Sequence, residues 1–316
     1  MKTICICNQK GGVAKTTTAV NLAAILARDF GKRVLVIDAD SQGNATSFLG
    51  GDKSRPGMAA LLQGAPMVPL QLTNTGTDMQ LIAASDELMD LDLTKAGEGK
   101  LALGCLSDLL QYLDTQPLPF DYCLIDCPPA FNAASSAALI AADAVLIPCK
   151  LDAFALEGMA NLTRQIANMR RINPKLRILG VLPVMWYRSD TIIKAESALR
   201  NAGLRVLPRI RRSDRVDDMT YHQQPLIVCS PRSAPCRDYR ALASWIVGQE
   251  RKERIATPSC ATVRNDSGED AAAGKPLRGH DVETGKRRPG RPRKGERIAT
   301  AACALPRNDR EGGVQA

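Results

Sequence analysis

The segment most able to do chemistry is a glycine turn from Asn8 to Thr17, with the sequence NQKGGVAKTT. It follows a short apolar run at residues 3–7 and precedes a helix-like stretch from Thr18 to Arg28. A strand, a glycine turn and a helix in this order form a phosphate cradle, because the N–H groups of the turn and the positive end of the helix dipole both attract an anion. We expect Lys15 to reach the β- and γ-phosphates and the Thr16 hydroxyl to ligate Mg²⁺.

The turn departs from the common GxxxxGK[ST] pattern, because Gln9 and Ala14 stand where that pattern has glycines. A second lysine, Lys10, stands instead at the head of the turn, in KGGVAKTT. This arrangement resembles the deviant Walker A motif of the ParA/MinD family of P-loop ATPases. The resemblance implies ATP and Mg²⁺ as cofactors and a nucleotide-binding loop made of Gly11, Gly12, Val13, Ala14, Lys15, Thr16 and Thr17. The alternative is a glycine-rich turn with two surface lysines, which the flanking strand and helix disfavour.

Two further apolar runs end in carboxylates. Residues 32–40 end at Asp38 and Asp40, and residues 121–126 end at Asp126, which Cys-Pro-Pro follows. Buried parallel strands deliver such residues to the edge of a sheet where ligands bind. In the resembled family, Asp40 positions or activates the attacking water, Asp38 helps to hold the magnesium shell, and Asp126 holds Mg²⁺ through water as the Walker B residue. The alternatives are helix capping by the first two acids and a simple strand end at the third.

Other predicted roles come from the same resemblance. In the family, a lysine at the position of Lys10 crosses to the phosphates of a second subunit, which implies a homodimer held together by ATP. Pro208 and Arg209 resemble a turn that lies over the adenine. Arg188 and Arg212 align with positions that bind double-stranded DNA nonspecifically, and two more arginines, Arg211 and Arg215, lie close to them in the sequence.

Strand-like and helix-like runs alternate from Met1 to about residue 249, which predicts an α/β fold with a doubly wound, mainly parallel sheet. The further predicted strands are residues 79–83, 144–148, 177–183 and 204–207. The further predicted helices are residues 58–63, 101–113, 157–171, 191–201 and 237–249.

Composition narrows the class of protein. Of the 316 residues, 45% are hydrophobic, which is enough for a substantial core. No run approaches the apolar length needed to span a bilayer, and the first residues lead directly into a strand, so we expect a cytoplasmic protein without a membrane partner. The ten cysteines lie in apolar stretches without a CxxC pair. We therefore expect most of them to be core residues and not disulfides or ligands of an iron–sulfur cluster.

The last part of the chain, residues 250–316, differs in composition. Residues 251–316 have 15 Lys and Arg against 9 Asp and Glu, and they account for +6 of the net charge of +9. We predict a disordered basic tail with a short duplicated segment, since ERIAT occurs twice. Arg291 lies in a Gly-Arg-Pro core flanked by basic residues, which resembles an AT-hook that enters the DNA minor groove. The alternative is a solvated basic linker with nonspecific attraction to phosphate.

Together these features predict a partition ATPase on the nucleoid. It would bind DNA as the ATP dimer and release it when a ParB-like partner stimulates hydrolysis. One alternative is a MinD-like membrane ATPase, which needs a basic amphipathic helix at the C-terminus that residues 308–316 do not form. Another is a ParA-like protein that positions a different cargo.

Overall fold

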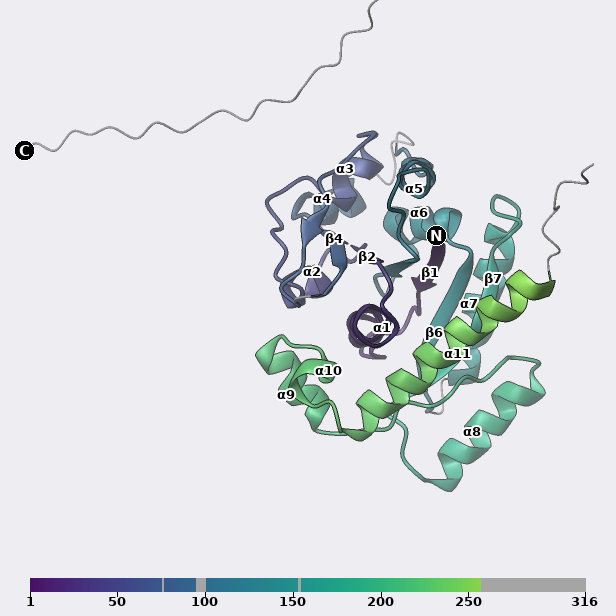
Figure 1. The fold of residues 1–316 in the computed structure, drawn as a ribbon. Helices are drawn as coiled ribbons and strands as arrows, with labels where there is room; N and C mark the ends of the chain where they lie inside the picture. The colour runs from purple at the N-terminus through teal and green to yellow at the C-terminus, as the bar shows by residue number, and fades with distance from the viewer. Residues whose placement is uncertain (76, 95–100, 153–154, 257–316) are drawn as a thin grey trace, which may run out of the picture. The chain divides into compact units, whose positions relative to one another are not determined.

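A seven-stranded sheet organises the computed structural model, which describes residues 1–75, 77–94, 101–152 and 155–256 (Figure 1). The strand order is β3-β4-β2-β5-β1-β6-β7, and all neighbours pair in parallel except β3 with β4. The prediction of a doubly wound, mainly parallel sheet is therefore confirmed. The strands are β1 (Lys2–Ile6), β2 (Val34–Asp38), β3 (Gln71–Leu72), β4 (Met79–Ile82), β5 (Tyr122–Asp126), β6 (Ala144–Lys150) and β7 (Arg177–Val184).

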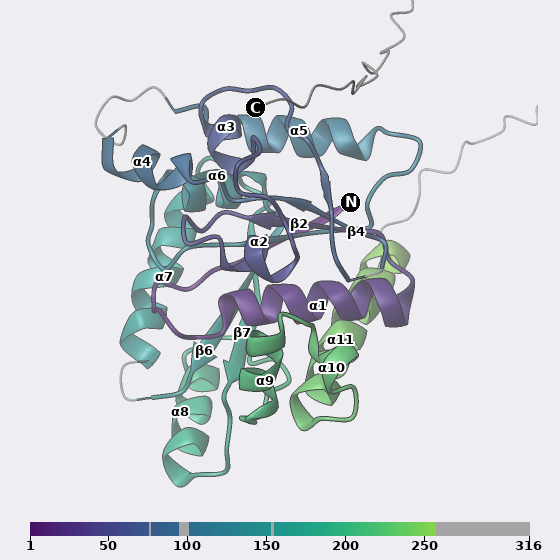
Figure 2. The same cartoon turned by 90° about the vertical axis from the view of Figure 1, so that its left-hand side faces the viewer.

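Helices cover both faces of the sheet (Figure 2). One face carries α1 (Lys15–Phe30), α2 (Asn44–Phe48), α9 (Arg215–His222), α10 (Leu226–Cys229) and α11 (Ala234–Ala256). The other carries α3 (Met58–Leu62), α4 (Glu87–Thr94), α5 (Cys105–Asp114), α6 (Ala133–Ala141), α7 (Ala155–Met169) and α8 (Asp190–Asn201).

The central strand β1 shows why the strands are apolar throughout. Ile4 and Ile6 belong to the core under α1, whereas Cys5 and Cys7 belong to the core on the other face. Successive side chains of a strand point to opposite faces, so a strand with helices on both sides needs apolar residues at every position. The predicted burial of the cysteines in the apolar stretches is confirmed for Cys5, Cys7, Cys123, Cys127 and Cys149.

Three sequence-based boundaries are wrong. The predicted strand at residues 204–207 makes a single bridge, Val181 to Val206, because the segment runs directly into Pro208, which has no N–H to continue a ladder. Between the predicted strand at residues 79–83 and the predicted helix at residues 101–113, where no helix is predicted, the structure has α4. The last helix continues to Ala256, seven residues past its predicted end and into the predicted tail. The rest of that tail, including Arg291, lies outside the described residues.

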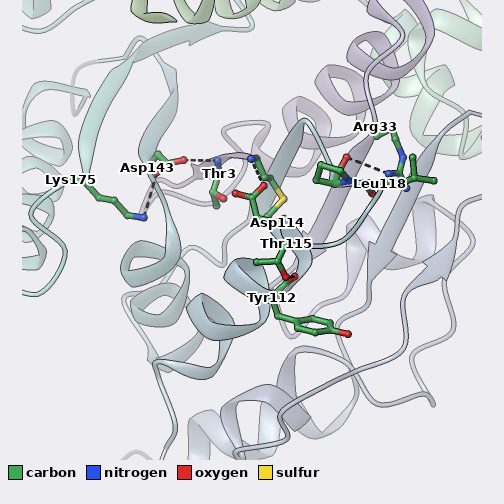
Figure 3. A network of polar contacts seen from close by, with 10 residues as sticks. Thr3, Arg33, Tyr112, Asp114, Thr115, Leu118, Asp143 and Lys175 are labelled. Carbon is green, nitrogen blue, oxygen red and sulfur yellow. Dashed lines mark hydrogen bonds and ion pairs between the residues drawn. The ribbon is translucent and has the colours of Figure 1, made fainter. Parts of the chain in front are cut away.

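Polar contacts fix the start of β1, the strand that leads into the glycine turn (Figure 3). The Asp143 carboxylate accepts a hydrogen bond from the Thr3 N–H at 2.9 Å and lies 3.7 Å from the Lys175 ammonium. The terminal ammonium of Met1 donates to Asp114 at 2.6 Å. These contacts join the start of β1 to the residue before β6 and to the last residue of α5. Among the described helices, none has the length and apolarity to cross a membrane.

Candidate nucleotide site

A cavity of about 680 Å³ lies where β1 leads into α1. The glycine turn, residues 11–17, forms one wall, and Asp40 lies beside it. A second wall comes from the ends of two distant segments, and it includes Val184, Met185, Tyr187, Ile210, Arg211, Arg212, Ser213 and Asp214. Ligands of open α/β sheets bind at the carboxyl ends of the strands, and this cavity has that location.

The backbone of the glycine turn has unused donors. Within the described chain, no N–H from Gly11 to Thr17 donates a hydrogen bond, and the Thr18 N–H is the first to do so, to the Ala14 carbonyl at 2.9 Å. Unpaired N–H groups at the start of a helix form an anion site. The predicted phosphate-binding residues are therefore together on one wall, and their donors are available to a polyphosphate.

Ala14 takes a strained conformation in this turn. Its φ is 57° and its ψ is 36°, in the left-handed region, and Gly12 has a φ of 67°. The left-handed region costs a residue with a Cβ about 1–2 kcal/mol, and glycine avoids this cost. Ala14 stands where many P-loops have glycine, and its backbone has the left-handed conformation that glycine adopts without strain.

We predict that Ala14→Gly raises the free energy of unfolding by up to about 1 kcal/mol. The relief of strain exceeds the entropy that glycine adds to the unfolded chain. Urea denaturation measures the change. Ala24→Gly, inside α1, is the matched control, and it is expected to destabilise the protein by about 1 kcal/mol or more. Equal destabilisation by both changes would contradict the account of Ala14.

The two lysines of the turn have different surroundings. Lys15 is buried, and its ammonium donates to the Lys10 carbonyl at 3.3 Å, across the mouth of the turn. Lys10 is exposed and forms an ion pair with Asp152, just after β6. The side chain of Gln9 donates to Gln165 of α7 at 2.6 Å. The head of the turn is thus held against the α7 side of the same subunit, while Lys15 lies inside the site.

Asp126 is a buried carboxylate at the end of a central strand. It is fully buried at the end of β5, and neither of its oxygens has a hydrogen-bond partner among the described residues. Burial raises its pKa well above the usual range, the negative charge of Asp38 raises it further, and the nearby Thr16 hydroxyl offsets part of the rise. An orphaned buried carboxylate beside a threonine hydroxyl fits a divalent cation with oxygen ligands. Thr16 and Asp126 are the residues of this chain that suit Mg²⁺.

Asp38 and Asp40 differ more than their spacing suggests. Asp38 is fully buried and accepts hydrogen bonds from the Thr46 N–H at 2.7 Å and the Thr46 hydroxyl at 2.8 Å. Burial raises the pKa of Asp38 to about 6, against the lowering effect of those bonds. Asp40 instead lies on the cavity wall and accepts from the Gln42 N–H at 3.0 Å. Asp40 is therefore placed for chemistry in the cavity, while Asp38 binds the start of α2.

The two residues predicted to contact the base lie elsewhere. Pro208 and Arg209 are exposed and are not among the residues that line the cavity. The Arg209 guanidinium lies 3.7 Å from the centre of the Trp186 ring. The apolar wall residues Met185 and Ile210 were missed. No local pattern marks them, because the pairing of residues 181–186 with 205–212 brings the two segments together.

The arginines predicted to bind DNA are not equivalent. Arg188 and Arg212 are exposed. Arg215 pairs with Asp218 at 2.9 Å, and Arg211 pairs with Asp238 at 2.6 Å. Arg211 and Arg212 both line the cavity.

Comparison with known proteins shows the family of the chain. A family described as an AAA domain matches residues 1–178. The chromosome partitioning protein ParA of Caulobacter vibrioides is 34% identical over 258 residues, covering 79% of this chain and 96% of the relative. The chromosome-partitioning ATPase Soj of Thermus thermophilus is 36% identical over 254 residues, covering 79% of this chain and 96% of the relative. The chain belongs to the ParA family of P-loop ATPases.

Solved structures extend the comparison. Apo McdA of Cyanothece has a TM-score of 0.67 and 28% identity, covering 78% of this chain and all of that one. Cobyrinic acid a,c-diamide synthase of Mycobacterium smegmatis, bound to an ATP analogue and magnesium, has a TM-score of 0.66 and 29% identity, covering 80% and 97%. The resemblance to the ParA/MinD family is confirmed, and the glycine turn is its P-loop.

Proposed function

We propose that this ParA-family chain is a partition ATPase that dimerises around ATP and binds double-stranded DNA nonspecifically as the dimer. A ParB-like partner would stimulate slow hydrolysis and so release the dimer from the nucleoid. The observation that carries the proposal is the cavity, which is lined by Lys15, Asp40 and seven N–H groups that make no hydrogen bond with the described residues. The buried Asp126 carboxylate lies beside one of the lining residues, Thr16. The ATPase domain would include α11 as far as Ala256, and the basic residues beyond it would form a separate tail.

The residues of the cavity divide the work of hydrolysis. The N–H groups of residues 11–17 and the Lys15 ammonium bind the phosphates, and Thr16 and Asp126 hold Mg²⁺. When bound, Mg²⁺ neutralises charge that develops on the phosphates. Asp40 lies on the wall of the cavity, where its carboxylate orients water for attack. Asp38 supports this arrangement through Thr46 and is not needed as a direct metal ligand.

The position of Lys10 supports dimerisation. Its side chain is not among those that line the cavity, is 42% exposed, and, among the described residues, pairs with Asp152 alone. An exposed pair of this kind is weak, typically about 0–1 kcal/mol, so the ammonium is easily released to a stronger anion. A second copy with bound phosphates offers such an anion, and a cation supplied in trans favours both association and turnover.

The charge of one segment supports DNA binding. Residues 164–212, from α7 to the second wall of the cavity, contain twelve Lys and Arg and only two acidic residues. Arg188 and Arg212 are exposed members of this segment that form no ion pair with the described residues, and Arg212 lines the cavity. Because two protomers double the number of phosphate contacts, DNA affinity is expected to depend steeply on both ATP and salt.

We predict that Arg188→Glu/Arg212→Glu weakens binding of random-sequence duplex DNA by the ATP dimer by about 100-fold or more at 100 mM salt. Four phosphate contacts per dimer are lost, so the slope of log affinity against log salt decreases in magnitude by about 3.6. Fluorescence anisotropy in full-length protein measures both values, and a chain ending at Ala256 separates any contribution of the predicted Arg291 contact.

The matched control is Arg28→Glu/Arg55→Glu, which changes the charge equally at exposed positions outside residues 164–212. It is expected to change the affinity less than fivefold. If the two double variants bind DNA equally well, Arg188 and Arg212 are not part of the DNA surface.

A further inference from the structure

One carboxylate on the last helix contacts the second wall of the cavity. The carboxylate of Asp238, on α11, accepts hydrogen bonds from the Arg211 guanidinium. Oδ1 accepts from Nη2 at 2.6 Å, and Oδ2 accepts from Nε at 2.9 Å. It also accepts the Arg211 backbone N–H at 2.9 Å. The Asp238 side chain is only 13% exposed. Charge-assisted, bidentate pairs are stronger and more directional than neutral hydrogen bonds, so this contact fixes both the side chain and the backbone of residue 211.

The same turn of α11 also reaches the helix of the P-loop. Tyr239 is buried, lines the cavity, and its hydroxyl lies 3.1 Å from the Thr18 hydroxyl of α1. Two adjacent residues of α11 therefore contact the two walls. Asp238 contacts the segment after Leu207, and Tyr239 contacts the start of α1. The distance between the walls decides whether one ligand touches both.

The part of a nucleotide that meets the second wall follows from the chemistry of the walls. The unused N–H donors and Lys15 take the phosphates. The ribose and base would then contact the remaining lining residues, among which Val184, Met185 and Ile210 provide apolar surface. The backbone of residues 210–212 pairs with the end of β7 and the residues after it, through the Ile210 N–H to the Pro183 carbonyl at 2.7 Å and the Arg212 N–H to the Trp186 carbonyl at 3.0 Å. The Asp238 contact adds a link from these residues to α11, the helix that also contacts α1.

We propose that Asp238 is a positioning residue for nucleotide binding: through Arg211 it holds residues 210–214 at the distance from the P-loop that a bound nucleotide needs. Asp238 itself is not among the cavity-lining residues, and it acts only through the wall. The inference rests on the assignment of this cavity as the nucleotide site.

The test measures binding of a fluorescent ATP analogue to full-length protein, with Asp238→Asn as the main variant. We expect its Kd to rise about tenfold, while turnover at saturating ATP stays within about twofold of the wild type. This split separates positioning from a general loss of fold. A Kd within twofold of the wild-type value would overturn the proposal.

Asp29→Asn is the matched control. It removes an ion pair of similar length between α1 and α11, from Arg240 Nε to Asp29 Oδ2 at 2.7 Å. Neither residue lines the cavity. Its Kd should match the wild type. An equal rise in both variants would mean that α11 packing in general, and not the Asp238 contact, sets the affinity.

A double variant tests the route through Arg211. If Asp238 acts through that residue, Asp238→Asn/Arg211→Ala binds within twofold of the weaker single variant, because the two changes remove one shared interaction. Multiplication of the two single effects would overturn the proposed route. If the wild type bound no nucleotide, the assignment of the cavity itself would fail, which is a different outcome from failure of Asp238 alone.

Discussion

Replacing Lys10 with alanine is expected to keep the protein monomeric with a non-hydrolysable ATP analogue and to lower ATP hydrolysis by about 100-fold or more. The change removes the cation that would reach the phosphates of a second subunit, and a cation supplied in trans has effects of this size in related phosphoryl-transfer sites. The fold should be unaffected, because the pair with Asp152 lies at the surface, with side-chain exposures of 42% and 30%. Light scattering and phosphate release are the measurements.

Two controls separate the possible roles of Lys10. Asp152→Ala removes the partner of the intrachain pair and should leave dimerisation intact, whereas an essential intrachain pair would make it behave like Lys10→Ala. Asp40→Ala should dimerise with ATP but fail to hydrolyse it, because Asp40 lies in the cavity and not at its rim. Normal hydrolysis and dimerisation by Lys10→Ala would remove the cross-subunit contact from the account.

Asp126→Asn is expected to stabilise the metal-free protein while it abolishes Mg²⁺-dependent hydrolysis. The wild-type carboxylate is fully buried without a hydrogen-bond partner among the described residues, and an uncompensated buried charge is costly. We expect the free energy of unfolding at pH 7.5, without Mg²⁺, to rise by about 1–3 kcal/mol. Hydrolysis should fall by at least about 100-fold, because the ligand for the metal is lost.

The stabilisation expected for Asp126→Asn depends on pH, and the direction of the change follows from the pKa of Asp126. Burial raises the pKa of Asp126 in the folded protein, so the unfolded chain releases its proton first as pH rises above about 4. Wild-type stability therefore falls with rising pH through that window, and the advantage of the variant grows from pH 5 to pH 7.5. Urea denaturation at both pH values measures it.

Asp121→Asn is the control at the other end of the same strand. Asp121 is paired, with Lys32 at 3.1 Å and the Arg33 N–H at 2.9 Å. Its replacement should therefore destabilise the protein by about 1 kcal/mol. If both substitutions destabilised the metal-free protein, Asp126 would have to be well compensated in the fold, and the argument for a cation at that position would weaken.

The sequence predicted those parts of the site that depend on neighbours along the chain. The P-loop is one continuous segment between a strand and a helix, and Asp40 and Asp126 stand at strand ends, so their positions follow from local structure. The role of Asp38 was less predictable, because Thr46, eight residues away, satisfies its carboxylate. Nothing in the spacing of the two acids distinguishes the buried one from the one in the cavity.

The residues of the second wall could be placed at the cavity only from the structure. Arg211 resembled a surface arginine near a DNA-binding position, but Asp238, 27 residues further on, holds it beside the cavity. The same long-range pairing brings Ile210 to the site and leaves Arg209 outside it, against Trp186. Local patterns carry little information about contacts between segments that meet only in the folded sheet. The predicted length of α11 was too short because the sequence becomes polar before the helix ends.

The most direct test of the central claim is the mass of the purified full-length protein, with and without a non-hydrolysable ATP analogue and Mg²⁺, together with its affinity for random duplex DNA. The account predicts a monomer without nucleotide, a dimer with the analogue, and tighter DNA binding only in the dimer. A protein that stays monomeric with the analogue and binds DNA equally in both states would contradict it.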